Sequence, residues 1–413
     1  MTIGLKTRGG ALLLGAAFAA LAGGAARADC AFQNEVPVKL LAAGFEAWKA
    51  ASDAMAECGN FTAELDQEFR TKQPAAFAAS PALYQIGGVS NGTITPLLNE
   101  GTIRPLDDLV AKYGQDLKPN QLIVVDGQIM AIAMMVNTFE LTYRKDILDD
   151  LGIEPPTTYD GMLEAAARIE DAGVVDYPLG GMTMAGWNIG LEFINMFGSS
   201  GQPLVNEDGT PNVNNETGIE SLEKIKAATE FYDPEYLVSD STYVQQQMQQ
   251  GKIAMVNLWA SRAGAMDDEA ESQVVGQVAT SMAPVAFEGA APVATLWWDG
   301  FVIAKNITDE EAEAAFRVAM EGIDRPMVEG ANEAAVWLVD GYQPGRLAQG
   351  AIETATHDPA PPSYPSTTEA GLMHTALGNQ LPDYFTGKRD AAATLAAVEE
   401  DYLTAAREAG VLQ

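Results

Sequence analysis

The sequence predicts an α/β protein of two domains, each built on a mainly parallel sheet flanked by helices. Apolar runs of strand length alternate along the chain with amphipathic stretches of helical period, and this alternation is typical of parallel sheets covered by helices. The chain has 413 residues, which is long enough for two domains. It has no recognisable repeat period.

The first 28 residues have the composition of a secretory signal peptide. Lys6 and Arg8 give a positive start, residues 11–22 form a short apolar stretch, and 26–28 make a small-residue cleavage site. The apolar stretch is too short to span a bilayer, and no later run is long and apolar enough to do so. Cys30 does not follow the apolar-then-small triplet of a lipid-attachment site. We therefore expect a soluble periplasmic protein without a lipid anchor.

The chain is strongly acidic, with 57 acidic against 24 basic residues and a formal net charge of −33. Such a surface repels phosphate backbones and anionic lipid heads. We therefore expect neither nucleic acid nor a membrane surface as a partner, and we attribute the charge to solubility in a salty medium.

Two cysteines, Cys30 and Cys58, lie near the start of the exported chain. In an oxidising compartment we expect them to form one disulfide, with a pair of free thiols as the alternative. The only histidines, His357 and His374, are far from both cysteines in sequence and are expected at the surface. The sequence therefore predicts no metal site and no cofactor.

The elements of the first part follow from apolar spacing. Residues 36–41 are a predicted strand and 44–57 the next helix, with Trp48 on its apolar face and hence in the core. Residues 82–88 are a strand that runs into a glycine turn. Further on, two apolar runs surround the pair 126–127, Asp-Gly, which is the strongest short-range signal for a tight hairpin.

Three elements are expected in the middle of the chain. A helix follows Thr157 or Thr158, one of which caps it. A second helix at 243–250 is stopped by a glycine, and 253–259 is the strand after it.

The last part begins with a strand at 297–304 and a helix whose Thr308 and Glu311 have capping-box spacing. Beyond it the chain is expected to be rich in loops, with Trp337 in an apolar run and hence in the core. An amphipathic helix at 390–409 ends the chain.

In order and detail these segments resemble the extracellular solute-binding proteins of carbohydrate ABC transporters. The hairpin and helix at 124–171, the segment 101–107 and the helix–strand element ending at Trp259 carry the resemblance. Two positions depart from the family pattern: Arg144 replaces the usual Asn, and the strand at 82–88 lacks the usual Asp. The resemblance covers nearly the whole exported chain and implies a two-lobed periplasmic binding protein of type II, with the ligand cleft between the lobes.

The resemblance also implies that each lobe is discontinuous, because the chain of such proteins crosses between lobes more than once. Lobe one is expected at 29–133 plus 288–325, and lobe two at 134–287 plus 326–413. The implied function is capture of a mono- or oligosaccharide by a monomer, which closes about a hinge and delivers the sugar to the permease subunits of an ABC importer.

Catalytic patterns are absent from the sequence. It has no His-Glu-x-x-His, no phosphate-binding Gly-x-x-x-x-Gly-Lys loop and no Gly-x-Ser-x-Gly elbow. Ser221 and Lys224 fit Ser-x-x-Lys by chance, since no Lys-Thr-Gly accompanies them. We therefore expect a binding protein and no enzyme. An exported glycoside hydrolase stays open as an alternative, because the acidic composition allows many carboxylate pairs.

Sugar capture needs flat aromatic rings for C–H faces, and acids, amides and cations for hydroxyls. The matching positions imply seven ligand-binding candidates: Phe45, Glu46, Asn137, Trp187, Trp259, Trp298 and Asp299. Each has a structural alternative, in the core for the aromatic residues and in helix capping for the polar ones. Trp297 and Trp298 are neighbours on a strand and point to opposite faces, so at most one of them reaches the ligand. A polyol, a polyamine or another osmolyte is the alternative to a sugar.

Overall fold

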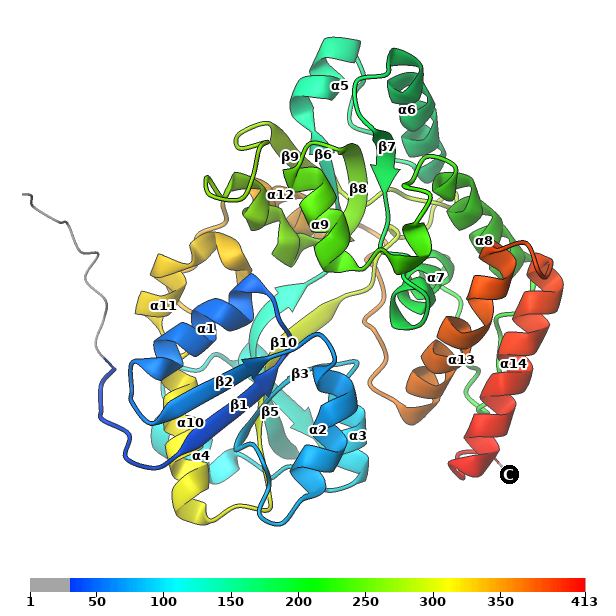
Figure 1. Cartoon of the computed structure of the whole chain (residues 1–413). Helices are drawn as coiled ribbons and strands as arrows, with labels where there is room; N and C mark the ends of the chain where they lie inside the picture. The colour runs from blue at the N-terminus through cyan, green and yellow to red at the C-terminus, as the bar shows by residue number, and fades with distance from the viewer. Residues whose placement is uncertain (1–29, 413) are drawn as a thin grey trace, which may run out of the picture.

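The computed structural model describes residues 30–412, which form two lobes that each contain one β-sheet (Figure 1). The predicted signal peptide and its cleavage site lie outside the described residues. Strands β5 (Gln128–Asn137) and β10 (Trp297–Ile303) are central in the first sheet and reach toward the second lobe. Among the described residues no helix combines the length and apolar character needed to cross a membrane.

The sheet of the first lobe has seven strands in the order β11-β5-β10-β3-β1-β2, with β4 beside β5. The strands not yet located are β1 (Val38–Ala42), β2 (Phe61–Leu65), β3 (Ile86–Ser90), β4 (Leu122–Val125) and β11 (Val336–Trp337). Strand β1 runs parallel to β2 and β3, and the other pairs are antiparallel.

The sheet of the second lobe has the strand order β7-β8-β6-β9. These strands are β6 (Phe139–Arg144), β7 (Tyr177–Gly180), β8 (Ile253–Trp259) and β9 (Val278–Met282). Only β7 and β8 are parallel. The α/β class with two sheets is confirmed, but the pairing is mixed instead of mainly parallel. In the first sheet β10, which returns from the second lobe, runs against the direction of both its neighbours, and in the second sheet β6 runs against both β8 and β9.

Helices cover both sheets. Those of the first lobe are α1 (Glu46–Ala56), α2 (Phe69–Ala78), α3 (Ile94–Asn99), α4 (Asp107–Tyr113), α10 (Asp309–Glu321) and α11 (Arg325–Gly330). Those of the second lobe are α5 (Lys145–Leu151), α6 (Tyr159–Ala172), α7 (Trp187–Ser199), α8 (Glu216–Thr229), α9 (Ser241–Gln249), α12 (Gln349–Thr356), α13 (Thr368–Phe385) and α14 (Ala391–Glu408). Helix α13 packs against α14 and α7 (Figure 1).

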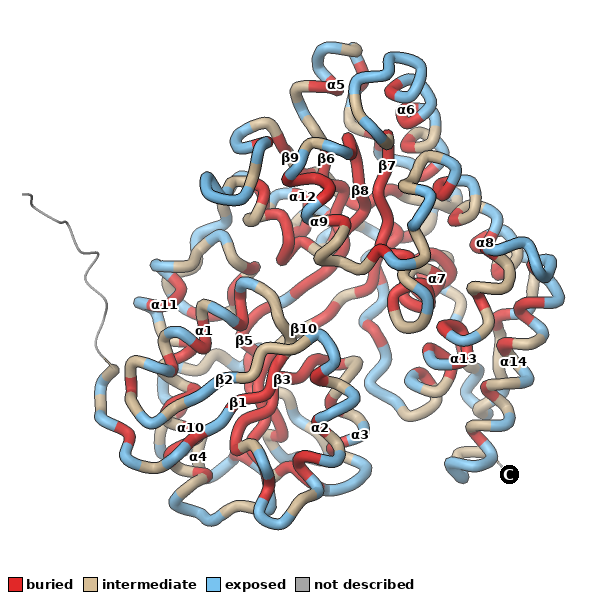
Figure 2. The backbone as a smooth tube through the Cα atoms, in the orientation of Figure 1, coloured by how far each residue is buried: buried red, intermediate tan, exposed pale blue. Residues whose placement is uncertain are grey.

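Buried residues follow the strands and the inner helix faces of both lobes (Figure 2). One apolar cluster fills the second lobe, and two lie in the first lobe. Trp48 and Trp337 are 1% and 3% exposed, as predicted for core residues. Helix α13 lies in the segment expected to be loop-rich, and His374 on this helix is buried, so the expectation of a surface histidine is wrong.

Several local signals produce the structure that they predict. Asp126 and Gly127 form the turn between β4 and β5 with φ of 50° and 79°. Thr158 caps α6 by accepting a hydrogen bond from the Gly161 N–H. Thr308 and Glu311 form the capping box of α10. Each of these signals acts within four residues, so no distant part of the chain is needed to produce it.

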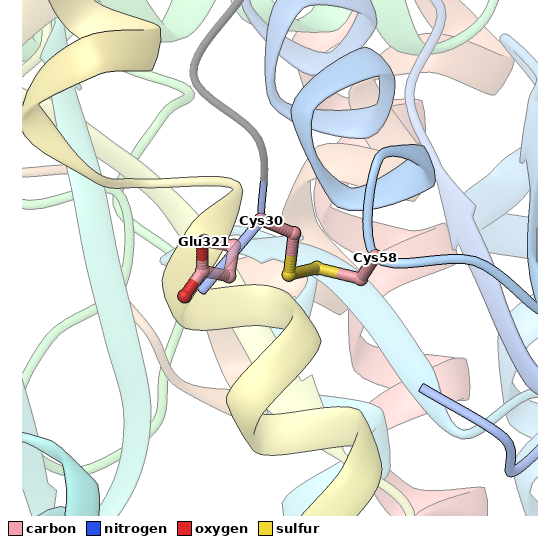
Figure 3. A group of neighbouring side chains, drawn as sticks. All are labelled: Cys30, Cys58 and Glu321. Carbon is pink, nitrogen blue, oxygen red and sulfur yellow. A yellow bond between two sulfur atoms is a disulfide. The ribbon is translucent and has the colours of Figure 1, made fainter. Parts of the chain in front are cut away.

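The predicted disulfide between Cys30 and Cys58 is present and ties the leading residues to the end of α1 (Figure 3). The Asn34 N–H donates to the Cys58 carbonyl at 2.7 Å beside it. Glu321 of α10 lies next to the disulfide, and its carboxylate accepts a hydrogen bond from the Ala31 N–H. Because both sulfurs are used in the disulfide, this group leaves no thiolate for a metal ion.

Sheet membership differs from the expected lobe boundaries in two places. Strand β5 continues in the first sheet to Asn137, beyond residue 133. Strand β11 also pairs with β5, although the expected boundaries put 326–413 in the second lobe. β11 has only two residues and leaves no composition signal in the sequence, and β5 is a central strand whose end at Asn137 is not marked by a glycine or proline.

Candidate ligand cleft between the lobes

A cavity of about 120 Å³ lies between the lobes and is lined by residues of both sheets and their helices. The first lobe contributes the start of α1, the start of α2 and the inner end of β10. The second lobe contributes the end of β8, the start of α7 and the 3-10 helix η3 (Ala260–Asp267). Side chains at strand ends and helix starts are held by rigid elements while their tips stay free, which suits ligand binding.

Trp297 and Asp299 of strand β10 line the cavity. They lie two residues apart on β10, so both side chains point to the same face of the sheet. The Trp297 ring contacts the rings of Trp187, Trp259 and Tyr364, and its Nε1–H donates to Thr295 Oγ1 at 2.7 Å.

Trp298 lies outside the cavity, which corrects the choice made from sequence. Its side chain packs against the apolar cluster on the other face of the first sheet. Successive side chains of a strand point to opposite faces of the sheet. If Asp299 faces the cleft, then Trp297 faces it too and Trp298 faces away.

Trp259 lies where the resemblance implies, at the end of β8 on the cavity wall. It is partly exposed, and its ring meets Phe139 and Trp297 edge-on at centroid distances of 4.6 and 5.4 Å. The ring is therefore held by aromatic neighbours while part of its surface faces the cavity.

Trp187 opens helix α7 and lines the same cavity. The guanidinium of Arg70 lies 4.4 Å from the centroid of its ring, and the ring of His374 stacks on it at 4.9 Å. His374 Nε2 lies 2.7 Å from the Trp187 carbonyl, and Nδ1 lies 2.8 Å from the Tyr364 hydroxyl. A carbonyl only accepts, so Nε2 carries the proton and Nδ1 accepts from Tyr364. Burial lowers the pKa of His374 to about 4, which keeps it neutral.

Asp299 is the carboxylate that the cavity leaves without a protein partner. No hydrogen bond or ion pair to it is found within residues 30–412. Its removal from water raises its pKa to about 7. A ligand hydroxyl that donates to this carboxylate would supply the missing partner.

Arg262 and Arg70 place two guanidinium groups on the cavity wall. Arg262 is 8% exposed and donates only to neutral groups, Gln245 Oε1 at 3.1 Å and Ser241 Oγ at 2.9 Å. Burial lowers its pKa to about 10. The Nε of Arg70 is buried without an acceptor, and burial lowers the pKa of this guanidinium as well.

The remaining candidates predicted from the sequence are Phe45, Asn137 and Glu46, and only the first two line the cavity. Phe45 is the N-cap of α1, lines the cavity and lies 6.0 Å from the Arg262 guanidinium. Asn137 also lines the cavity, but its amide donates to Ser261 Oγ and accepts from backbone N–H groups, so the protein already uses it. Glu46 is exposed outside this cavity and pairs with Lys49.

A second cavity of about 550 Å³ adjoins the first and shares Arg70, Thr93 and Trp187 with it. Its walls are the α3 region of the first lobe and the α13 region of the second. Asn99 Nδ2 donates to Thr368 Oγ1 at 2.8 Å across these walls. The two cavities therefore lie side by side, with Arg70 and Trp187 in the walls of both.

The chemistry of the cleft is that of recognition of a polar, hydroxylated molecule. Aromatic rings can cover apolar C–H faces, and Asp299 and the two arginines can bind hydroxyls or acidic groups. The only group of three metal-ligating side chains found in the described part of the chain is the one that contains the disulfide.

Sequence reasoning missed Trp297, Arg70 and Arg262. Trp297 could have been found from its spacing to Asp299. The two arginines carry no local signal, because α2 meets β10 only through the packing of the first lobe, and η3 joins them only where the two lobes meet.

The fold is similar to that of solved ligand-binding proteins. A ribitol complex of an ABC transporter solute-binding protein from Agrobacterium radiobacter K84 matches with a TM-score of 0.78 at 20% identity over 91% of this chain and 99% of that chain. A D-mannitol complex from Agrobacterium vitis S4 matches with a TM-score of 0.76 at 19% identity over 91% and 99%. Maltose-bound MalE3 of T. maritima gives a TM-score of 0.74 at 16% identity over 89% and 99%.

The sequence itself matches a family model. The model described as bacterial extracellular solute-binding protein matches residues 50–320, which include both cleft strands β8 and β10 and both arginines. The chain therefore belongs to the bacterial extracellular solute-binding protein family.

Proposed function

We propose that this chain is the periplasmic substrate-binding subunit of an ABC importer and that it captures a sugar or polyol between its lobes. The observation that carries the proposal is the meeting of Trp259 and Trp297 with the unpartnered carboxylate of Asp299 in one inter-lobe cavity. Rings that cover C–H faces next to an acceptor for hydroxyls are the two requirements of carbohydrate recognition. Delivery to permease subunits and action as a monomer are parts of the same proposal.

Among solved proteins of this fold, complexes with ribitol and D-mannitol support a polyol as the ligand, and complexes with maltose and maltotriose support a short oligosaccharide. The volume of about 120 Å³ beside the tryptophans fits a small ligand, and the adjoining cavity of about 550 Å³ leaves room for a larger one. Polyamines fit less well, because a polycation would meet the guanidinium groups of Arg70 and Arg262 in this cavity.

A thermal-shift panel of polyols, monosaccharides and short oligosaccharides, followed by calorimetric titration, tests the proposal. A ligand that binds only the native state stabilises it by about 2.7 kcal/mol at a hundredfold excess over Kd. We expect one class to raise the melting temperature and to be recovered unchanged. A shortened or modified sugar in the recovered sample would favour the exported hydrolase instead.

A further inference from the structure

The two arginines of the cleft form no ion pair with a carboxylate of the described residues. Arg168, Arg317 and Arg407 lack one too, but Arg168 and Arg407 are exposed, and Arg317 lies against the rings of Phe32 and Tyr113. Arg104, Arg144, Arg325, Arg346 and Arg389 each form an ion pair with a carboxylate. In a chain with 57 acidic residues such pairing is easy to achieve. Yet between residues 30 and 412 no carboxylate forms an ion pair with Arg70 or Arg262.

Burial makes this lack of a partner costly. Taking a charge out of water is unfavourable unless a counter-charge and hydrogen bonds replace the water. Arg262 has hydrogen bonds, but the nearby carboxylates of Asp240 and Glu46 form no ion pair with it. Arg70 has an orphaned Nε, lies against the Trp187 ring and forms no ion pair with the nearby Glu68. The free-energy cost of burying these two guanidinium groups is lowest when a bound ligand brings the negative charge that pairs with them.

The carboxylates that line the same cavity do not supply that charge. Asp240 caps helix α9 by accepting from the N–H groups of Thr242 and Tyr243. Glu68 is exposed, and Asp299 has a pKa raised to about 7, so part of its population is protonated. None of these three carboxylates forms an ion pair with Arg70 or Arg262, so both guanidinium groups stay open to an acidic group of a ligand.

Helix α7 adds to this positive character. It begins at the junction of the two cavities, and its N-cap is Gly186, which has no side chain to accept from the first N–H groups. The positive end of the helix dipole therefore faces the cleft at Trp187.

We propose that the ligand is a sugar or polyol derivative that carries an acidic group, a carboxylate or a phosphate ester, bound by Arg70 and Arg262. This inference rests on the proposed function and narrows its ligand class. The hydroxylated part lies between Trp259 and Trp297 with Asp299, and the acidic group points to the guanidinium groups. Planar guanidinium groups bind carboxylate and phosphate oxygens through paired hydrogen bonds.

Matched ligand pairs test the proposal in calorimetric titrations of the purified protein. The pairs are glucose with glucuronate, glucose with glucose 6-phosphate, and sorbitol with gluconate. We expect at least one acidic member to bind about tenfold or more tightly than its neutral parent, since a charge-assisted hydrogen bond is worth more than a neutral one. Comparison of the two carboxylate pairs with the phosphate pair then shows which acidic group the protein prefers.

Arg70→Gln is the decisive variant, because Arg70 makes no hydrogen bond or ion pair with the described protein and its loss should leave the fold intact. The preference for the acidic member should fall to about threefold or less. Arg325→Gln is the matched control, since it removes the same charge from an exposed helix and should leave the preference unchanged. Arg70→Lys keeps the charge but loses the planar geometry, so an intermediate preference is expected.

Three results would overturn the proposal. Neutral parents that bind as tightly as their acidic partners in all three pairs would remove the acidic ligand class and leave sugar or polyol binding intact. An acidic preference that survives in Arg70→Gln would remove the assignment to Arg70. Failure of every neutral and acidic polyhydroxylated compound to bind would instead overturn the proposed function, and the acidic class with it.

Discussion

Replacement of Asp299 by Asn should make the stability of the unliganded protein less sensitive to pH. The side chain has no partner within the described chain, lines the inter-lobe cavity and has a pKa raised from 3.8 to about 7 by loss of water contact. When folding raises the pKa of an acid, the unfolded chain loses the proton of that acid at a lower pH than the folded protein does. Stability is therefore lost as pH rises from about 4 to about 7, and it stays lowered above that range.

The size of the effect follows from the pKa change. At about 1.36 kcal/mol per pH unit, a rise from 3.8 to about 7 corresponds to an upper limit of about 4 kcal/mol. Asp299 is partly exposed to the cleft, so water screens part of this cost. We expect Asp299→Asn to be more stable than the parent protein by about 2 kcal/mol at pH 8 and to differ little from it at pH 4.

Urea denaturation of both proteins at several pH values, followed by circular dichroism, measures this difference without relying on the cleft tryptophans. The quantity that matters is the gap between the two proteins at each pH, because the other carboxylates titrate equally in both. A gap that stays constant from pH 4 to pH 8 would refute the reasoning. Calorimetric titration should at the same time show weaker ligand binding by the variant, since Asn accepts hydroxyl donors less strongly than a carboxylate.

Three further predictions concern other parts of the molecule. Trp259→Ala should weaken ligand binding by about 2 kcal/mol, or about thirtyfold in Kd, and a large loss of stability with unchanged affinity would place this ring in the core instead. Alkylation of the unreduced protein should find no free thiol, and Cys30→Ser with Cys58→Ser should lower the free energy of unfolding by about 3 kcal/mol in denaturant melts. Asn99→Ala removes the hydrogen bond to Thr368 between the lobes and should reduce affinity two- to tenfold in titrations with little change in apo stability; an equal loss of both would mean that the bond supports the fold and not closure.

The parts of the fold that the sequence predicts well are those decided by nearby residues. The turn at Asp126-Gly127 and the capping box at Thr308 need only adjacent residues, and strand β8 was expected with the bounds that it has. Helix α13 was missed because the proline cluster before it suggested loops, although Thr367 caps its start by accepting from the Ala370 N–H. Strand direction was also missed, since pairing depends on which lobe the chain comes from and not on the apolar pattern of the strand.

The cleft residues also differ in whether nearby sequence is enough to predict them. Trp259 could be placed by matching a strand and its end, and Trp297 follows from its spacing to Asp299 once the strand face is fixed. Arg70 and Arg262 could not be found this way, because they lie on α2 and η3 of different lobes and line one cavity only where the lobes meet. Their lack of ion pairs becomes visible only in the structure, where Glu68 and Asp240 line the same cavity without forming an ion pair with either arginine. If Arg70 and Arg262 bind an acidic group of the ligand, as proposed, then the residues that set the charge of the ligand are the ones least visible in the sequence, since the needs of a helix or strand do not select them.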